Sequence, residues 1–234
     1  MFGLFYDPRY LLFMAPAFLL MMLVQWYVQS AYNRWSQVAA RSRLSGAQAA
    51  QRLIQAGGLY GVRVEGVQGR LSDHYDPRQK VLRLSPGVYQ GNSVAALAIA
   101  AHELGHAMQD NDGYFLLRLR AALVPAVNIG SYLGWILIVI GMLLRMTEVS
   151  WLGVLVFSGG ALFALATLPV ELNASARARQ LLTSSGLIVS DDELRGVNNV
   201  LNAAALTYVA ALITAVLQLL YWVTMLLGMG GRRR

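Results

Sequence analysis

The sequence predicts a mainly α-helical membrane protein in which four transmembrane helices carry a small α/β domain. Hydrophobic residues make up 56% of the 234 residues, against about 45–50% in ordinary soluble domains. Charged residues make up 13%, which is about half of the usual share. The chain also contains four apolar runs that are long enough to cross a bilayer as helices. Together these observations exclude a disordered chain, a coiled coil and an ordinary soluble globule.

The four apolar runs are each close to the roughly 20 residues that a transmembrane helix requires. The first could instead be a signal peptide, but it is long for one, and a retained anchor is favoured. The runs cover residues 10–28, 121–144, 149–170 and 203–227. We therefore divide the chain into a first transmembrane helix (1–28), a polar domain (29–120), a transmembrane hairpin (121–170), a helical segment (171–202), and a fourth transmembrane helix with a basic tail (203–234).

The topology follows from the number of spans. Four spans place both termini on one side of the membrane, so segments 29–120 and 171–202 are expected together on the other side. The net charge is +7, and the basic residues avoid the apolar runs. In a membrane protein this pattern indicates that the basic residues set the orientation and contact lipid headgroups, and not that they bind nucleic acid. Seven arginines near span ends on the side of segment 29–120, against five on the other side, favour a cytoplasmic location for this segment.

Local patterns predict a small mixed α/β domain in segment 29–120. A helix capped by Ser45 is followed by two strands with alternating side chains, and residues 74–78 between the strands have turn character, which suggests a hairpin. The second strand, 80–85, is short and charged, which suits a sheet edge where a peptide could add by backbone hydrogen bonding. An alanine-rich helix is expected at 93–109.

The alanine-rich helix contains His102-Glu103-Leu104-Gly105-His106, the pattern H-E-x-x-H. About one helical turn separates the histidines, so both imidazoles lie on one face and can hold one zinc ion. Glu103 can take a proton from the water that the zinc activates and pass it to a leaving amine. The chain has no cysteine, which excludes thiolate metal sites and cysteine nucleophiles. The pattern predicts a zinc-protease domain built around this helix, with one Zn²⁺ per chain.

A hydrolytic zinc site usually has three protein ligands and one water, so one ligand remains to be assigned. His74 is the only other histidine and stands in the polar turn. Glu171 is the better candidate, because small residues follow it on the same helical face and allow close packing against the motif helix. Its alternative role is a carboxylate that caps a helix or faces lipid headgroups. Asn173 or Ser175 could orient a histidine ligand.

Beyond the zinc motif, the chain contains Asp73-His74-Tyr75-Asp76-Pro77-Arg78, and Gln109 follows the motif closely. With these residues, and with Glu171 ahead of Ala174-Ser175, most of the chain resembles the YugP-type family of membrane-bound neutral zinc metallopeptidases. The D-H-Y-D-P-R stretch makes the resemblance specific, since many unrelated proteases share the zinc motif alone. The resemblance implies a gluzincin-like site, in which His102, His106 and Glu171 hold the zinc and Glu103 is the base.

The predicted function is that of an integral-membrane zinc-dependent endopeptidase, which hydrolyses peptide or protein substrates, including membrane proteins. An intramembrane zinc protease is an alternative, but such enzymes usually take a ligand from an aspartate in a later span, and the apolar runs contain none. A membrane scaffold with a structural zinc site is another alternative. It would need a fourth protein ligand, which only His74 could supply. We expect a multi-pass protein of the bacterial plasma membrane.

Overall fold

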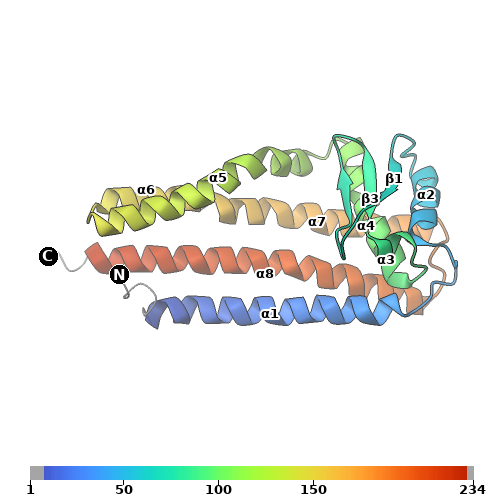
Figure 1. The fold of residues 1–234 in the computed structure, drawn as a ribbon, viewed down its shortest axis with the longest axis horizontal. Helices are drawn as coiled ribbons and strands as arrows, with labels where there is room; N and C mark the ends of the chain where they lie inside the picture. Colours follow the sequence, from blue (N-terminus) through green and yellow to red (C-terminus); the bar gives the residue numbers. More distant parts are fainter. Residues whose placement is uncertain (1–7, 231–234) are drawn as a thin grey trace. The chain divides into compact units, whose positions relative to one another are not determined.

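The computed structural model describes residues 8–230, which divide into two units. The first, here named the mixed unit, consists of Gln25–Arg118 and Pro169–Leu206. The second, here named the helical unit, consists of the chain before Gln25, Leu119–Leu168 and the chain from Thr207 onward. Four helices contribute residues to both units (Figure 1): α1 (Pro8–Ser36), α5 (Phe115–Leu143), α7 (Gly159–Ser184) and α8 (Asp191–Gly230).

Among residues 8–230, four helical stretches are long and apolar enough to cross a membrane, as the sequence predicts. They are Pro8–Ser36, Phe115–Leu143, Thr147–Ser184 and Asp191–Gly228. The third stretch differs from the single span expected at 149–170, because α6 (Thr147–Phe157) ends before α7 begins. Ser158 and two glycines follow α6, and such residues are common where a helix is interrupted.

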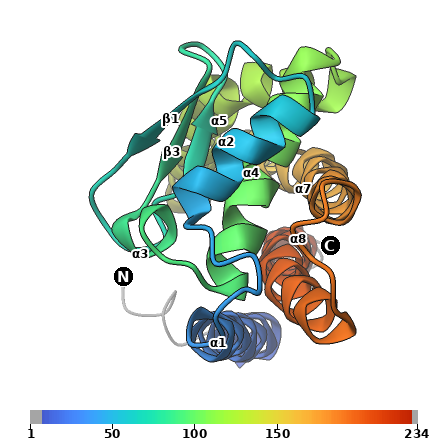
Figure 2. The same ribbon diagram turned by 90° about the vertical axis from the view of Figure 1, so that its right-hand side faces the viewer.

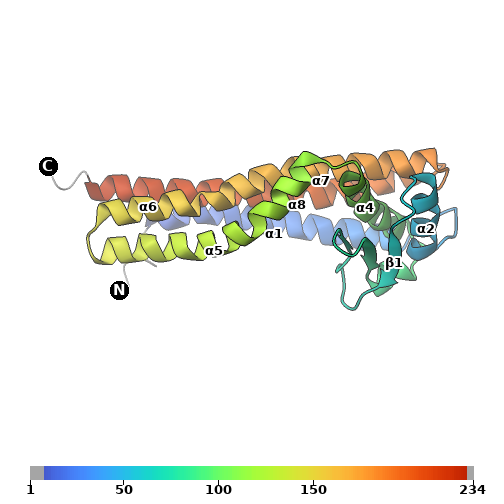
Figure 3. The ribbon, with the colours of Figure 1, turned by 90° about the horizontal axis from the view of Figure 1, so that it is seen from above.

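In the helical unit, α5 and α6 lie side by side (Figures 1 and 3) and are brought close by glycines. A Cβ on Gly153 of α6 would stand 2.6 Å from the backbone nitrogen of Ile138 in α5. Small residues of this kind let membrane helices approach backbone to backbone. Helices α1 and α8 meet through aromatic rings, with Tyr10 and Tyr221 edge to face at 5.2 Å between centroids.

The mixed unit contains a three-stranded sheet in the order β1-β3-β2. β3 (Val81–Leu84) is parallel to β1 (Arg63–Gly66) and antiparallel to β2 (His74–Asp76). Three predictions were therefore wrong. The two predicted strands do not form a hairpin, because β1 and β3 pair in parallel. The strand expected at the edge is the central one, because Leu82 and Leu84 are fully buried and a buried apolar strand can take partners on both sides. The residues expected to form a turn include the edge strand β2.

Helices α2 (Gly46–Ala56) and α4 (Val94–Asn111) lie on the same side of the sheet (Figure 2). The predicted cap of α2 is confirmed, since the Ser45 side chain accepts a hydrogen bond from the backbone of Gln48. The predicted alanine-rich helix is confirmed as α4, which begins after Ser93. The short helix α3 (Pro86–Tyr89) connects β3 to α4. Leucines from four elements fill the core of the mixed unit: Leu53, Leu82, Leu97, Leu104 and Leu182.

Candidate metal centre

His102 and His106 lie on α4, and their ring centroids are 5.0 Å apart. The apolar side of α4 fixes the helix in the core of the mixed unit, where Leu97 and Leu104 have no exposed surface. The two imidazole side chains are 13% and 12% exposed. Both rings are therefore held in place by packing, yet both remain accessible to a small ligand.

Glu171 lies on α7, 69 residues after His102, and is almost completely buried. Its Oε2 atom is 3.2 Å from Nε2 of His102 and 3.4 Å from Nε2 of His106. One possible ligand atom from each of the three residues lies within 4.8 Å of the others. The structure thus brings together the three side chains that the sequence suggests as metal ligands.

Gly105 and Ala174 allow α4 and α7 to approach each other closely. A Cβ on Gly105 would stand 3.0 Å from the carbonyl carbon of Ala174 and 3.1 Å from its Cα. Ala174 and Ala178 are fully buried, and Ser175 is nearly so. A glycine within a helix costs about 1 kcal/mol relative to alanine. At this position the glycine removes a steric conflict with the backbone of α7.

His106 is oriented by Gln109, which is fully buried. Oε1 of Gln109 is 2.9 Å from Nδ1 of His106. The amide nitrogen of Gln109 donates to the carbonyl oxygen of Val170 at 2.7 Å and to Oδ1 of Asn173 at 2.9 Å. Because an amide oxygen can only accept, Nδ1 of His106 carries the proton. Nε2 then keeps its lone pair, which is the form that binds a metal.

His102 has a partner in Ser175, whose Oγ is 3.2 Å from Nδ1 of His102. The sequence suggests Asn173 or Ser175 as an orienting residue. In the structure Ser175 contacts a histidine directly, whereas Asn173 contacts Gln109. The role of Gln109 was not predicted. Its position three residues after His106, on the same helical face, is the signal that could have revealed it.

Glu103 follows His102 in α4 and is not part of the three-residue cluster. Burial raises the pKa of the Glu103 carboxyl, the two histidines oppose this, and the carboxylates of Glu171 and Asp73 raise it further. The net pKa lies above the ordinary value for a glutamate. Burial lowers the pKa of His106, but hydrogen bonding to Glu171 and Gln109 and the charges of Glu103 and Glu171 together outweigh it, so that this pKa is raised. A carboxyl with a raised pKa can both accept and release a proton nearer neutral pH.

The D-H-Y-D-P-R stretch connects β2 to the elements around it. Asp73 accepts hydrogen bonds from the backbone nitrogen of Ser85 at 2.7 Å and from its hydroxyl. The Tyr75 hydroxyl donates to Oδ2 of Asp110 in α4 at 2.9 Å. Burial and the neighbouring Asp110 raise the pKa of Tyr75, so the phenol keeps its proton. These bonds fix β2 against the helix that carries the histidines.

The donor set suits zinc. Two imidazole nitrogens and one carboxylate oxygen are a common set of protein ligands in hydrolytic zinc sites, and the cluster could bind a metal. His74 is exposed, and its Nδ1 is 2.8 Å from the carbonyl oxygen of Ser72. Among residues 8–230 it does not belong to the cluster. A metal held by three protein ligands has a fourth position for water or substrate.

Comparison with known proteins identifies the family of the chain. Residues 10–227 match a protein family described as "Putative neutral zinc metallopeptidase". The chain is 46% identical over 203 residues to "Putative membrane protease YugP" of Bacillus subtilis (strain 168), and the match covers 87% of this chain and 90% of that protein. No solved structure matches. The resemblance found in the sequence is confirmed, and the chain belongs to the family of putative neutral zinc metallopeptidases.

Proposed function

We propose that this chain is an integral-membrane zinc-dependent endopeptidase that holds one Zn²⁺ through His102, His106 and Glu171. The observation that carries this proposal is the convergence of the three donor atoms within 4.8 Å of one another. Family membership supports a zinc peptidase. The relative named as a membrane protease and the four apolar helices support a membrane location.

The proposed chemistry is hydrolysis of a peptide bond. A zinc ion at this site supplies Lewis acidity, which makes a water more acidic and polarises the peptide carbonyl. Glu103 is the general base that takes a proton from the attacking water. The C–O bond forms, the C–N bond breaks, and Glu103 passes the proton to the nitrogen of the leaving amine. The raised pKa of Glu103 supports a carboxyl that performs both transfers.

The free edge of β2 is the place where we propose that a peptide binds. β2 pairs with β3 on one side, and no other strand within residues 8–230 pairs with its outer side. Asp73 directly precedes β2 and is close enough to Glu103 to raise its pKa. This edge therefore lies near the proposed base. Backbone hydrogen bonds to an edge strand hold a peptide in an extended conformation and depend little on its side chains.

The mixed unit is proposed to face the cytoplasm, on the opposite side of the membrane from both termini. Four candidate spans support a mixed unit and termini on opposite sides of the membrane. Seven arginines near span ends on the side of the mixed unit, against five on the other side, support the cytoplasmic side. Of the two alternatives, a scaffold with a structural zinc site would need His74 as a ligand. The position of this side chain outside the cluster supports the peptidase.

Metal-dependent proteolysis by the purified full-length protein tests the proposal. We expect the zinc-loaded wild type to cleave an unfolded protein such as casein, and to stop when a chelator removes the metal. Glu103→Gln should retain about one zinc per chain but lose about 10²–10⁴-fold in rate. Glu65→Gln is the matched control, because it removes a carboxylate that is 45% exposed on β1. Cleavage by Glu103→Gln at the control rate would refute the role of Glu103.

A further inference from the structure

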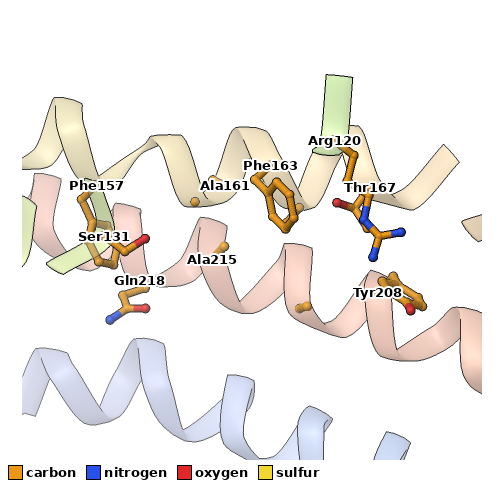
Figure 4. Close-up of a pocket in the computed structure, with 12 residues that line it drawn as sticks. Arg120, Ser131, Phe157, Ala161, Phe163, Thr167, Tyr208, Ala215 and Gln218 are labelled. Atoms are coloured by element: carbon orange, nitrogen blue, oxygen red, sulfur yellow. The ribbon is translucent and has the colours of Figure 1, made fainter. Parts of the chain in front are cut away.

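A cavity of about 570 Å³ lies within the helical unit, between α5, α7 and α8 (Figure 4). Its volume falls in the range of about 300–1,000 Å³ that is usual for small-molecule sites. None of the residues that line it belongs to the metal centre. Most of its wall consists of small or aromatic side chains, among them Phe157, Ala161, Phe163, Ala164, Ala211 and Ala215.

Three hydrogen-bond donors lie at one end of this cavity (Figure 4): the Arg120 guanidinium, the Thr167 hydroxyl and the Tyr208 hydroxyl. Thr167 is only 4% exposed, and its hydroxyl has no hydrogen-bond partner among residues 8–230. A buried hydroxyl without a partner costs free energy. Arg120 directly precedes the predicted second span, where lipid headgroups are expected. This end of the cavity therefore contains a guanidinium group, which has five N–H donors, and offers a hydroxyl that a ligand could satisfy.

The cavity is long and narrow. Its lining extends along α5 from Arg120 to Ser131 and along α8 from Tyr208 to Gln218. At 1.5 Å per residue these stretches rise about 15–16 Å, which is about half of a hydrocarbon core of roughly 30 Å. A cavity of this volume and extent can accommodate an acyl chain.

We propose that this cavity binds one anionic phospholipid. The phosphate lies at the Arg120 end, where the guanidinium supplies the charge and the Thr167 hydroxyl donates a hydrogen bond. One acyl chain extends between α7 and α8, along the small side chains of Ala164 and Ala215. Charge complementarity selects the anionic lipid, since basic pockets between transmembrane helices recognise anionic headgroups.

Native mass spectrometry of the full-length protein in detergent tests this proposal. The probes are phosphatidylglycerol and phosphatidylcholine with the same acyl chains. We expect the wild type to retain one phosphatidylglycerol in preference to phosphatidylcholine. Arg120→Gln should weaken phosphatidylglycerol binding about fivefold, the effect of one basic residue near a membrane surface. Arg118→Gln is the matched control, because Arg118 is exposed and does not line the cavity.

A second pair of variants tests the hydroxyl. Thr167→Val should weaken phosphatidylglycerol binding about threefold, as expected for one hydrogen bond. Thr214→Val is its control, since the Thr214 hydroxyl is also buried without a partner but does not line the cavity. Ala164→Leu fills the cavity and should abolish retention of the lipid. Ala215→Leu, on the opposite wall, repeats this test if Ala164→Leu does not give monodisperse protein.

Three results would overturn the proposal. One is equal retention of the two lipids by the wild type, and another is unchanged phosphatidylglycerol binding in the folded leucine variants. The third is a wild-type mass that corresponds to two chains and is absent in Ala164→Leu. This result would mean that a second copy of the chain occupies the cavity. Because the mass of bound lipid is measured and not cleavage, the outcome is independent of the proposed peptidase activity.

Discussion

Replacing Gly105 with alanine should weaken zinc binding by forcing α4 away from α7. The new Cβ would overlap the carbonyl oxygen of Ala174, its nearest neighbour, and would stand 3.0 Å from the carbonyl carbon, whereas ordinary contacts of a Cβ begin at 3.4 Å. The two helices must therefore separate by more than 0.4 Å, the difference between these two distances, because the oxygen is closer still. Metal–ligand distances tolerate about 0.2 Å. The shift would move both histidines away from Glu171 by more than this tolerance.

We expect the zinc affinity of Gly105→Ala to fall about 10–100-fold, as it does when an outer partner of a metal ligand is removed. The free energy of unfolding without metal should fall by about 1–3 kcal/mol, the usual cost of overpacking. In an unobstructed helix the same substitution would stabilise the protein by about 1 kcal/mol. The sign of the change therefore reports directly on the contact between α4 and α7.

Competition with a zinc chelator measures the affinity, and denaturant unfolding of the metal-free protein measures the stability. Gly159→Ala is the control, because a Cβ on this residue of α7 meets nothing within 4 Å. It should leave the zinc affinity unchanged. If Gly105→Ala binds zinc as tightly as Gly159→Ala, the close approach of the two helices does not determine the geometry of the site.

Three further outcomes are expected. Glu171→Ala should lose most of its zinc in metal analysis, and full zinc content would exclude Glu171 as a ligand. Gln109→Leu should weaken zinc binding about 10–100-fold in chelator competition, because His106 loses the partner of its Nδ1, and an unchanged affinity would contradict this role. Reporter fusions after Gly61 and after Arg234 should report opposite compartments, and a shared compartment would refute the four-span topology.

The elements that the sequence predicts well are those fixed by local chemistry. The Ser45 cap and the alanine-rich helix depend on neighbours in the chain, and the four spans depend only on apolar length. The order of the strands depends on contacts that local patterns do not contain. β3 alternates like an edge strand, yet it is central because β1 and β2 both pair with it.

The candidate site likewise contains some residues that local patterns predict and others that they do not. The histidine pair can be predicted from the sequence because four residues make about one helical turn. Glu171 is predicted from the ligand that the metal still lacks, together with the small residues that follow it on one helical face. Gln109 was missed because its partners Val170 and Asn173 lie 61 and 64 residues away. The spacing from His106 to Gln109 is visible in the sequence, but the hydrogen bonds that join α4 to α7 leave no such spacing.

The separation of His102 and Glu171 by 69 residues also affects how the protein is made. The ribosome synthesises α4 well before α7, so the nascent chain carries both histidines before the third donor exists. In the proposed enzyme the metal is then held by two residues only, which is too few for a hydrolytic site. Full activity has to wait until the apolar stretch Thr147–Ser184 has been synthesised. The order of synthesis thus leaves an incomplete chain without the third ligand of the proposed site.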